Sequence, residues 1–278
     1  MYTQDSQAID HQLILRAGLA RPIANFAALP STLDDLLPNN DRIPSGAAEL
    51  GVTAGLTSLL RFSQNFALSL SADINYNTFN NAVAEQQLRS AVLSASLGGV
   101  NLGVLSTLLG INTRYQSQPY LHTFLTSGLR YDLPVLMGLL NIYACAEAGM
   151  LYGIAPQTEA NISVSLPFLM WRADATLTRP QANTLTFAYK LGAGATLFDR
   201  IHLGVTYAFS QPSYTVTPTI RTAITEVQGM LTLPGLGTIS TQTLANILAG
   251  AITSAFQTTP VQYQFLVQLF QLTVGYAF

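Results

Sequence analysis

The chain has 278 residues, a formal net charge of -2, and Asp, Glu, Lys or Arg at only 9% of its positions. Soluble proteins carry about 25% charged residues, so this chain has too few charges to cover a surface that faces water. The small net charge, without basic clusters, argues against nucleic acid as a partner, and the single cysteine, Cys145, excludes an internal disulfide. No run reaches the roughly 18 to 20 consecutive apolar residues of a spanning helix, which leaves a closed β-barrel as the way to cross a membrane.

Eight stretches of the sequence alternate apolar and polar residues with the period of two that is typical of β-strands. In chain order they cover residues 11–21, 48–61, 66–77, 119–131, 139–154, 184–197, 201–211 and 262–278. The third stretch shows the pattern clearly, because Leu70 lies between Ser69 and Ser71. The sequence therefore predicts an all-β fold in which each strand has one apolar face and one polar face.

The connections between these stretches alternate between long and short. The long ones cover residues 22–47, 78–118, 155–183 and 212–261, and three short turns separate them. Short periplasmic turns and long extracellular loops are typical of an up-and-down outer-membrane barrel. We therefore expect a single barrel domain over residues 1–278, with residues 1–10 as a periplasmic tail. Residues 161–166 and 169–178 also alternate, so ten strands stay open as an alternative to eight.

The last stretch places Leu272, Val274, Tyr276 and Phe278 on one face and ends on the aromatic Phe278. This ending and the strand pattern resemble the small eight-stranded outer-membrane barrels of the OmpA, OmpW and opacity types. The resemblance implies that Phe278 is an assembly signal for the barrel assembly machinery, and that lipid of a Gram-negative outer membrane surrounds the barrel. Because Met1 to Asp5 do not form an export signal, we expect a mature chain whose secretory signal has been removed.

The polar faces carry few charged groups, which suits a narrow lumen better than the exterior of a soluble barrel with an apolar interior. The predicted lumen charge network consists of Arg16, Asp73, Arg130, Glu147, Lys190 and His202. Asp73, Arg130 and Glu147 come from consecutive strands, so we expect a ladder of ion pairs, because an isolated buried charge is costly. Such a network either fills the tube as a plug or lines a narrow polar channel, and both interpretations stay open.

Tyrosines gather on the apolar faces, often toward the strand ends. The set consists of Tyr76, Tyr131, Tyr152, Tyr189, Tyr207 and Tyr276. Aromatic belts mark the two interfaces of membrane barrels, so we expect these side chains to lie at the membrane surface.

The sequence shows no pattern of catalytic or metal-binding residues. His11, His122 and His202 lack the Ser two residues later that the outer-membrane lipid A deacylase family would require. A lipid-modifying enzyme is therefore the least favoured function, and we expect neither a metal nor a cofactor.

Two of the predicted outer loops carry long segments without charge, residues 90–113 and the segment from 227 to the last strand. Their apolar side chains include Leu105, Leu109, Leu244 and Leu248. Thr241 to Phe256 have the spacing of a short helix. Loops of this kind either pack on each other or contact another protein, a second copy of the chain or lipid. The sequence thus predicts a structural or interaction role, as a subunit of an outer-membrane complex, with a narrow channel for small or hydrophobic solutes as the alternative.

Overall fold

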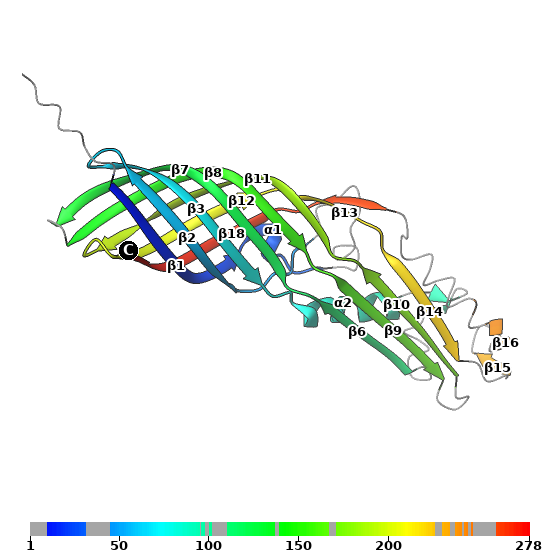
Figure 1. The fold of residues 1–278 in the computed structure, drawn as a ribbon. Helices are drawn as coiled ribbons and strands as arrows, with labels where there is room; N and C mark the ends of the chain where they lie inside the picture. Colours follow the sequence, from blue (N-terminus) through cyan, green and yellow to red (C-terminus); the bar gives the residue numbers. More distant parts are fainter. Residues whose placement is uncertain are drawn as a thin grey trace, which may run out of the picture.

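Eight antiparallel strands close into a barrel in the computed structural model of the chain (Figure 1). The structure describes residues 10–31, 45–94, 96–97, 100–101, 110–136, 139–166, 171–225, 230–233, 237–240, 242–243, 246 and 260–278. Around the barrel the strands follow the order β1 (Asp10–Pro22), β18 (Val267–Ala277), β12 (Ile201–Ser210), β11 (Ala182–Leu197), β8 (Leu140–Ala155), β7 (Tyr120–Leu136), β3 (Phe66–Asn77) and β2 (Gly51–Arg61). The prediction of eight strands is confirmed, and the alternative of ten is wrong.

The barrel closes where β1 pairs with both β2 and β18. Leu15 lies opposite Leu56 on one side and opposite Tyr276 on the other, so the sheet has no free edge within the membrane. We call the end with the three short connections the turn end, and the opposite end the loop end. Since short turns of such barrels face the periplasm, we expect the turn end on the periplasmic side.

Strand β7 is longer at its turn end than the sequence predicted. The predicted turn covered residues 132–138, whereas in the structure Asp132 pairs with Tyr143 of β8 and the strand continues to Leu136. Side chains two residues apart share a face of a strand. Asp132 therefore points into the lumen together with Arg130.

The predicted last strand is divided into two. Its first part is β17 (Val261–Gln264), which pairs with β13 (Ser213–Val216) outside the barrel. Phe265 follows β17 and donates its N–H to the carbonyl oxygen of Pro212. The alternation of apolar residues continues across this break, which is why the pattern alone did not reveal it.

A second sheet projects from the loop end of the barrel, away from the C-terminus (Figure 1). This outer sheet has the strand order β14 (Thr219–Thr225), β10 (Trp171–Arg179), β9 (Thr158–Leu166) and β6 (Gly110–Ser117). The predicted loops 78–118, 155–183 and 212–261 therefore contain regular strands, and the stretches at 161–166 and 169–178 form an outer hairpin. Local pattern could not place that hairpin, because a strand with one buried face has the same period in either sheet.

One face of the outer sheet carries buried apolar side chains. Ile162, Val164 and Ala175 on this face belong to the same hydrophobic cluster as Phe124 inside the barrel. Helix α2 (Asn81–Ser94) lies beside β6 and contributes buried side chains to the same cluster. The core thus extends without a break from the lumen into the outer sheet and fixes the sheet to the barrel.

The remaining elements are short: α1 (Ala24–Ala27), β4 (Ser96–Leu97), β5 (Val100–Asn101), β15 (Met230–Leu233) and β16 (Gly237–Ser240). No helix within the described ranges is long and apolar enough to cross a membrane, a finding that does not bear on strands. Most of the helix predicted for Thr241 to Phe256 lies outside the described residues.

Candidate functional site

Large apolar side chains cover the outside of the barrel. Phe187 is 64% exposed and Leu272 is 57% exposed. A continuous apolar surface of this kind is unsuited to water, but it is the band that a membrane barrel presents to lipid. The apolar faces predicted from the sequence therefore point outward, and the polar faces point into the lumen.

The six tyrosines predicted for the interface lie on this exterior. Five have exposed side chains, and Tyr207 is half-buried. At the turn end, Tyr131 contacts Phe66, and Tyr276 contacts Phe278. The N–H of Phe278 donates to the carbonyl oxygen of Leu13 in β1 over 2.9 Å. Phe278 therefore extends the pairing between β18 and β1 that closes the barrel.

The middle of the lumen contains a compact cluster of charges. Lys190 is 1% exposed, and its Nζ lies 2.6 Å from Asp73 Oδ2 and 2.9 Å from Glu147 Oε2. Arg16 Nη2 lies 2.7 Å from Asp73 Oδ1. The structure therefore brings together four of the six residues of the predicted network. Two cations and two carboxylates leave this cluster with no net charge.

Hydroxyl groups complete the surroundings of Glu147. Ser71 donates to Oε1 over 3.0 Å and Thr126 donates to Oε2 over 2.7 Å, while Ser69 also donates to Oε1. With the ammonium of Lys190 the carboxylate has four donors. A buried charge is tolerated when it is paired and hydrogen-bonded, and Glu147 meets both conditions.

Arg130 is not part of this cluster, so the predicted ladder through Arg130 is wrong. Its Nη2 lies 2.7 Å from Asp132 Oδ1, and it also donates to Thr196 Oγ1 over 3.0 Å. Arg61 Nη1 lies 3.2 Å from Asp132 Oδ2, as an ion pair without the geometry of a hydrogen bond. Asp132 was not predicted in the network because the sequence indicated a turn there, and Arg61, at the end of the predicted strand 48–61, was not singled out on its polar face. The sequence did contain a signal for this pair, because Arg130 and Asp132 are two residues apart and would share one face if the strand continued.

The ring of Tyr143 lies in the lumen beside the charge cluster formed by Arg130, Asp132 and Arg61. The guanidinium carbon of Arg130 lies 3.8 Å from the centre of the Tyr143 ring. Gly194 and Gly204 make room for the Tyr143 ring. A Cβ at Gly194 would lie 2.6 Å from atoms of Tyr143, and a Cβ at Gly204 would lie 2.5 Å from its hydroxyl oxygen. The space left among the lumen side chains here is about 20 Å³, which is enough for about one water molecule.

His202 lies in the same region of the lumen, where its Nδ1 is 3.0 Å from Thr196 Oγ1 and its Nε2 is buried without a partner. His122 lies at the other end, with neither ring nitrogen hydrogen-bonded. No group of three His, Cys, Asp or Glu side chains in the described part of the chain is placed to hold a metal ion.

A plug of aromatic rings fills the loop end of the lumen. Phe26 of α1 is fully buried, and its ring meets those of Tyr120, His122 and Phe265 edge to face at centroid distances of 5.0, 5.3 and 5.6 Å. Tyr120 donates from its hydroxyl to the carbonyl oxygen of Gly46 over 2.7 Å. The plug is therefore built from α1, β7, the segment before β2 and the segment before β18.

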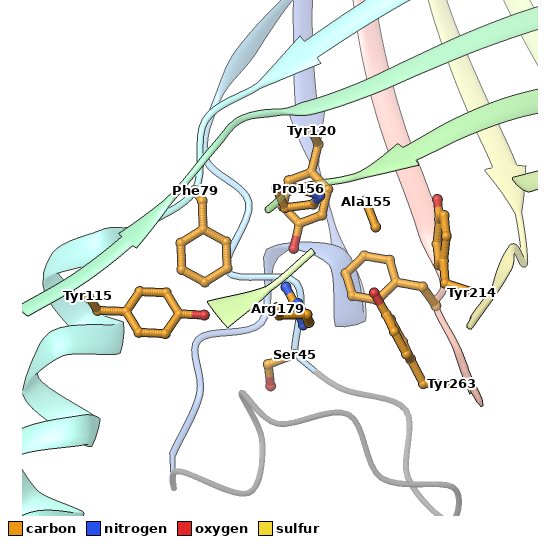
Figure 2. Close-up of a pocket in the computed structure, with 10 residues that line it drawn as sticks. Ser45, Phe79, Tyr115, Tyr120, Ala155, Pro156, Arg179, Tyr214 and Tyr263 are labelled. Atoms are coloured by element: carbon orange, nitrogen blue, oxygen red, sulfur yellow. The ribbon is translucent and has the colours of Figure 1, made fainter. Parts of the chain in front are cut away.

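Arg179, at the end of β10, lies next to Tyr120 and Phe265 of the plug, and Figure 2 shows it below Tyr120. It is 8% exposed, and its Nε has no hydrogen-bond partner. Within the described ranges no carboxylate lies within ion-pair distance of it. Tyr115, Tyr120 and Tyr263 surround the guanidinium. Nothing in the sequence around Arg179 indicates that it is buried, because the segments that bury it lie far apart in the chain.

The residues predicted for the loop contacts, Leu105, Leu109, Leu244 and Leu248, lie outside the described residues. Their proposed contact with a partner stays a prediction.

A closed eight-stranded barrel with an apolar exterior, interfacial aromatic side chains and a polar lumen defines an integral β-barrel of the outer-membrane class. The chain is similar in fold to a major outer membrane protein from Thermus thermophilus, at 9% identity and a TM-score of 0.33, over 97% of this chain and 99% of that chain. It is also similar to the outer membrane protein OprG from Pseudomonas aeruginosa, at 11% identity and a TM-score of 0.36, over 97% of each chain. No family model and no curated protein match the chain. These scores describe loose superpositions, so the class rests on the barrel and its surfaces.

Proposed function

We propose that this outer-membrane barrel has a closed lumen and anchors the outer sheet as a platform that binds another protein. The filled lumen supports the proposal most directly. Three groups of side chains fill the lumen along the barrel axis. They are the cluster around Lys190, the cluster around Arg130 and the plug around Phe26. Eight strands leave an interior that side chains can just fill. The proposal assigns no reaction to the chain and needs no metal or cofactor.

The packing and the hydrogen bonds of the outer sheet support the second half of the proposal. Its buried face shares the core of the barrel mouth, while its other face carries polar side chains held in place by one another. Thr176 donates to Asn161 Oδ1 over 2.7 Å, and Asn161 donates to Glu159 Oε1 over 2.8 Å. A surface whose side chains are already ordered loses less entropy on binding, which favours a role in recognition.

Planar bilayer recordings test the closed lumen. We expect purified, heat-modifiable wild-type protein to produce no steady conductance, because side chains fill the lumen at three levels. Stable single-channel steps from folded protein would overturn the closed lumen and favour the narrow channel for small solutes.

Site-specific photo-crosslinking in native membranes tests the platform. A photoreactive residue in place of Ser163, on the polar face of β9, should form a discrete protein adduct. The matched control replaces Val205, which faces lipid on β12 and is 50% exposed. Adducts at neither position, or only at Val205, would contradict the platform role.

A further inference from the structure

No described residue places an acid beside the cation at the barrel mouth. Arg179 is 8% exposed and has neither a hydrogen bond nor an ion pair with any described residue. Its guanidinium carbon lies 5.8 Å from the centre of the Tyr263 ring, a contact that supplies no negative charge. An arginine side chain stays protonated at all ordinary pH values. A buried charge without a counter-charge is strongly unfavourable, so this position favours a negative charge that the described part of the chain does not supply.

Hydroxyl groups beside Arg179 are available as further donors. Figure 2 shows the hydroxyls of Tyr115, Tyr120 and Tyr263 turned toward the guanidinium. Tyr120 donates to Gly46, while Tyr115 and Tyr263 have no hydrogen-bond partner among the described residues. Burial raises the pKa of Tyr263, against the opposing effect of Arg179. The phenol therefore stays neutral and offers a proton, not a negative charge.

The space between these donors is small and enclosed. It measures about 10 Å³, which is close to the room that one water molecule occupies by this measure. A carboxylate-bearing solute or a phosphate needs several times that room. We propose that Arg179, with the hydroxyls of Tyr115 and Tyr263, binds one monatomic anion of the size of chloride at the junction of barrel and outer sheet.

A water molecule in this space would satisfy hydrogen bonds but not the charge. The three donors come from β10, β6 and β17, and a neutral water molecule between them would leave the guanidinium charge unbalanced. A chloride ion accepts from all three and neutralises the guanidinium. Its binding would tie the outer sheet to the barrel mouth and so stiffen the platform.

Chloride-35 line broadening measures the binding on the full chain in detergent, at constant ionic strength with gluconate as the replacing anion. We expect saturable broadening with wild type. Arg179→Met should weaken binding about tenfold or more, because it removes a charge-assisted hydrogen bond. Arg172→Met is the matched control, since it removes the same charge from an exposed site on the same strand, and it should bind chloride within about a factor of two of wild type.

A bromide-soaked crystal of the wild type gives an answer that needs no variant. An anomalous peak between Arg179, Tyr115 and Tyr263 is expected. If bromide shows no peak there, and chloride broadening is equal in wild type and Arg179→Met, the proposal is wrong and water fills the space. If Arg179→Met does not fold, Tyr263→Phe should still weaken chloride binding, and unchanged binding in that variant would also count against the site.

Discussion

Two buried cations of this barrel have opposite surroundings. Lys190, in the middle of the lumen, is 1% exposed and contacts two carboxylates, whereas Arg179, at the mouth, is 8% exposed and is surrounded by tyrosine rings. Inward positions of the barrel strands are fixed by register, so acids and bases from several strands can meet across the tube. The described residues around Arg179 come from connections outside the barrel strands and from the strand ends, and none of them places a carboxylate beside it. The charges in the middle of the lumen therefore balance one another, whereas the charge of Arg179 is not balanced by any described residue.

The largest expected effect follows from removing the central cation. Lys190→Met leaves Asp73 and Glu147 close together in the lumen, where only Arg16 remains to balance them. Breaking a buried pair on one side costs about 3–5 kcal/mol, so we expect a loss of that size in the free energy of unfolding. Denaturant unfolding in lipid vesicles, followed by the heat-modifiable shift on gels, measures it.

A neutral background distinguishes unpaired charge from lost packing. The double variant Lys190→Met, Glu147→Gln keeps the ion pair between Arg16 and Asp73 and leaves the cluster without net charge, so it should recover most of the stability lost by Lys190→Met alone. A double variant as unstable as the single one would show that unpaired charge does not explain the loss.

The aromatic plug is the next largest contribution. Phe26→Ala should cost about 3 kcal/mol, the lower part of the range for removing a buried Phe ring, because the ring fills the mouth between Tyr120, His122 and Phe265. Hydrogen exchange should report faster exchange at the amides of Gly46 and Ala48, which donate to the backbone of α1. Unchanged protection there would show that the plug does not hold the mouth closed.

A single hydroxyl of the central cluster should matter less. Thr126→Val removes one donor from Glu147 and keeps the shape of the side chain, and a hydrogen bond to a charged group contributes about 1.5–3 kcal/mol. We expect the lower end, about 1.5 kcal/mol, because Ser69, Ser71 and Lys190 still donate to the carboxylate. The same denaturant unfolding detects this loss, and a value near zero would argue against Glu147 being charged in the lumen.

The smallest effect is expected on the outer sheet. Arg172 and Asp174 form an exposed pair on β10, with Nε 2.8 Å from Oδ2. Exposed pairs contribute about 0–1 kcal/mol, so Arg172→Met should change the free energy of unfolding by less than about 0.5 kcal/mol. A larger loss would indicate that the outer face of the sheet is covered in the folded protein.

Much of the barrel could be predicted from the sequence because the information is local. Alternation with a period of two defines eight strands and assigns each side chain to lipid or lumen, as at Leu70 between Ser69 and Ser71. The low charge content then decides which face points outward. The same local pattern could not distinguish the outer hairpin of β9 and β10 from a barrel hairpin. A strand with one buried face alternates with a period of two in either sheet.

The sequence by itself therefore determined the class of fold and the inward set that includes Arg16, Asp73, Glu147 and Lys190, whereas the tertiary structure decided between eight and ten barrel strands. Only the tertiary structure decided which of these side chains touch, because contacts across a closed barrel depend on the stagger between strands and not on their order in the chain. For that reason Arg130 pairs with Asp132 and not with the carboxylates of neighbouring strands. The surroundings of Arg179 likewise arise only when segments far apart in the chain close around it.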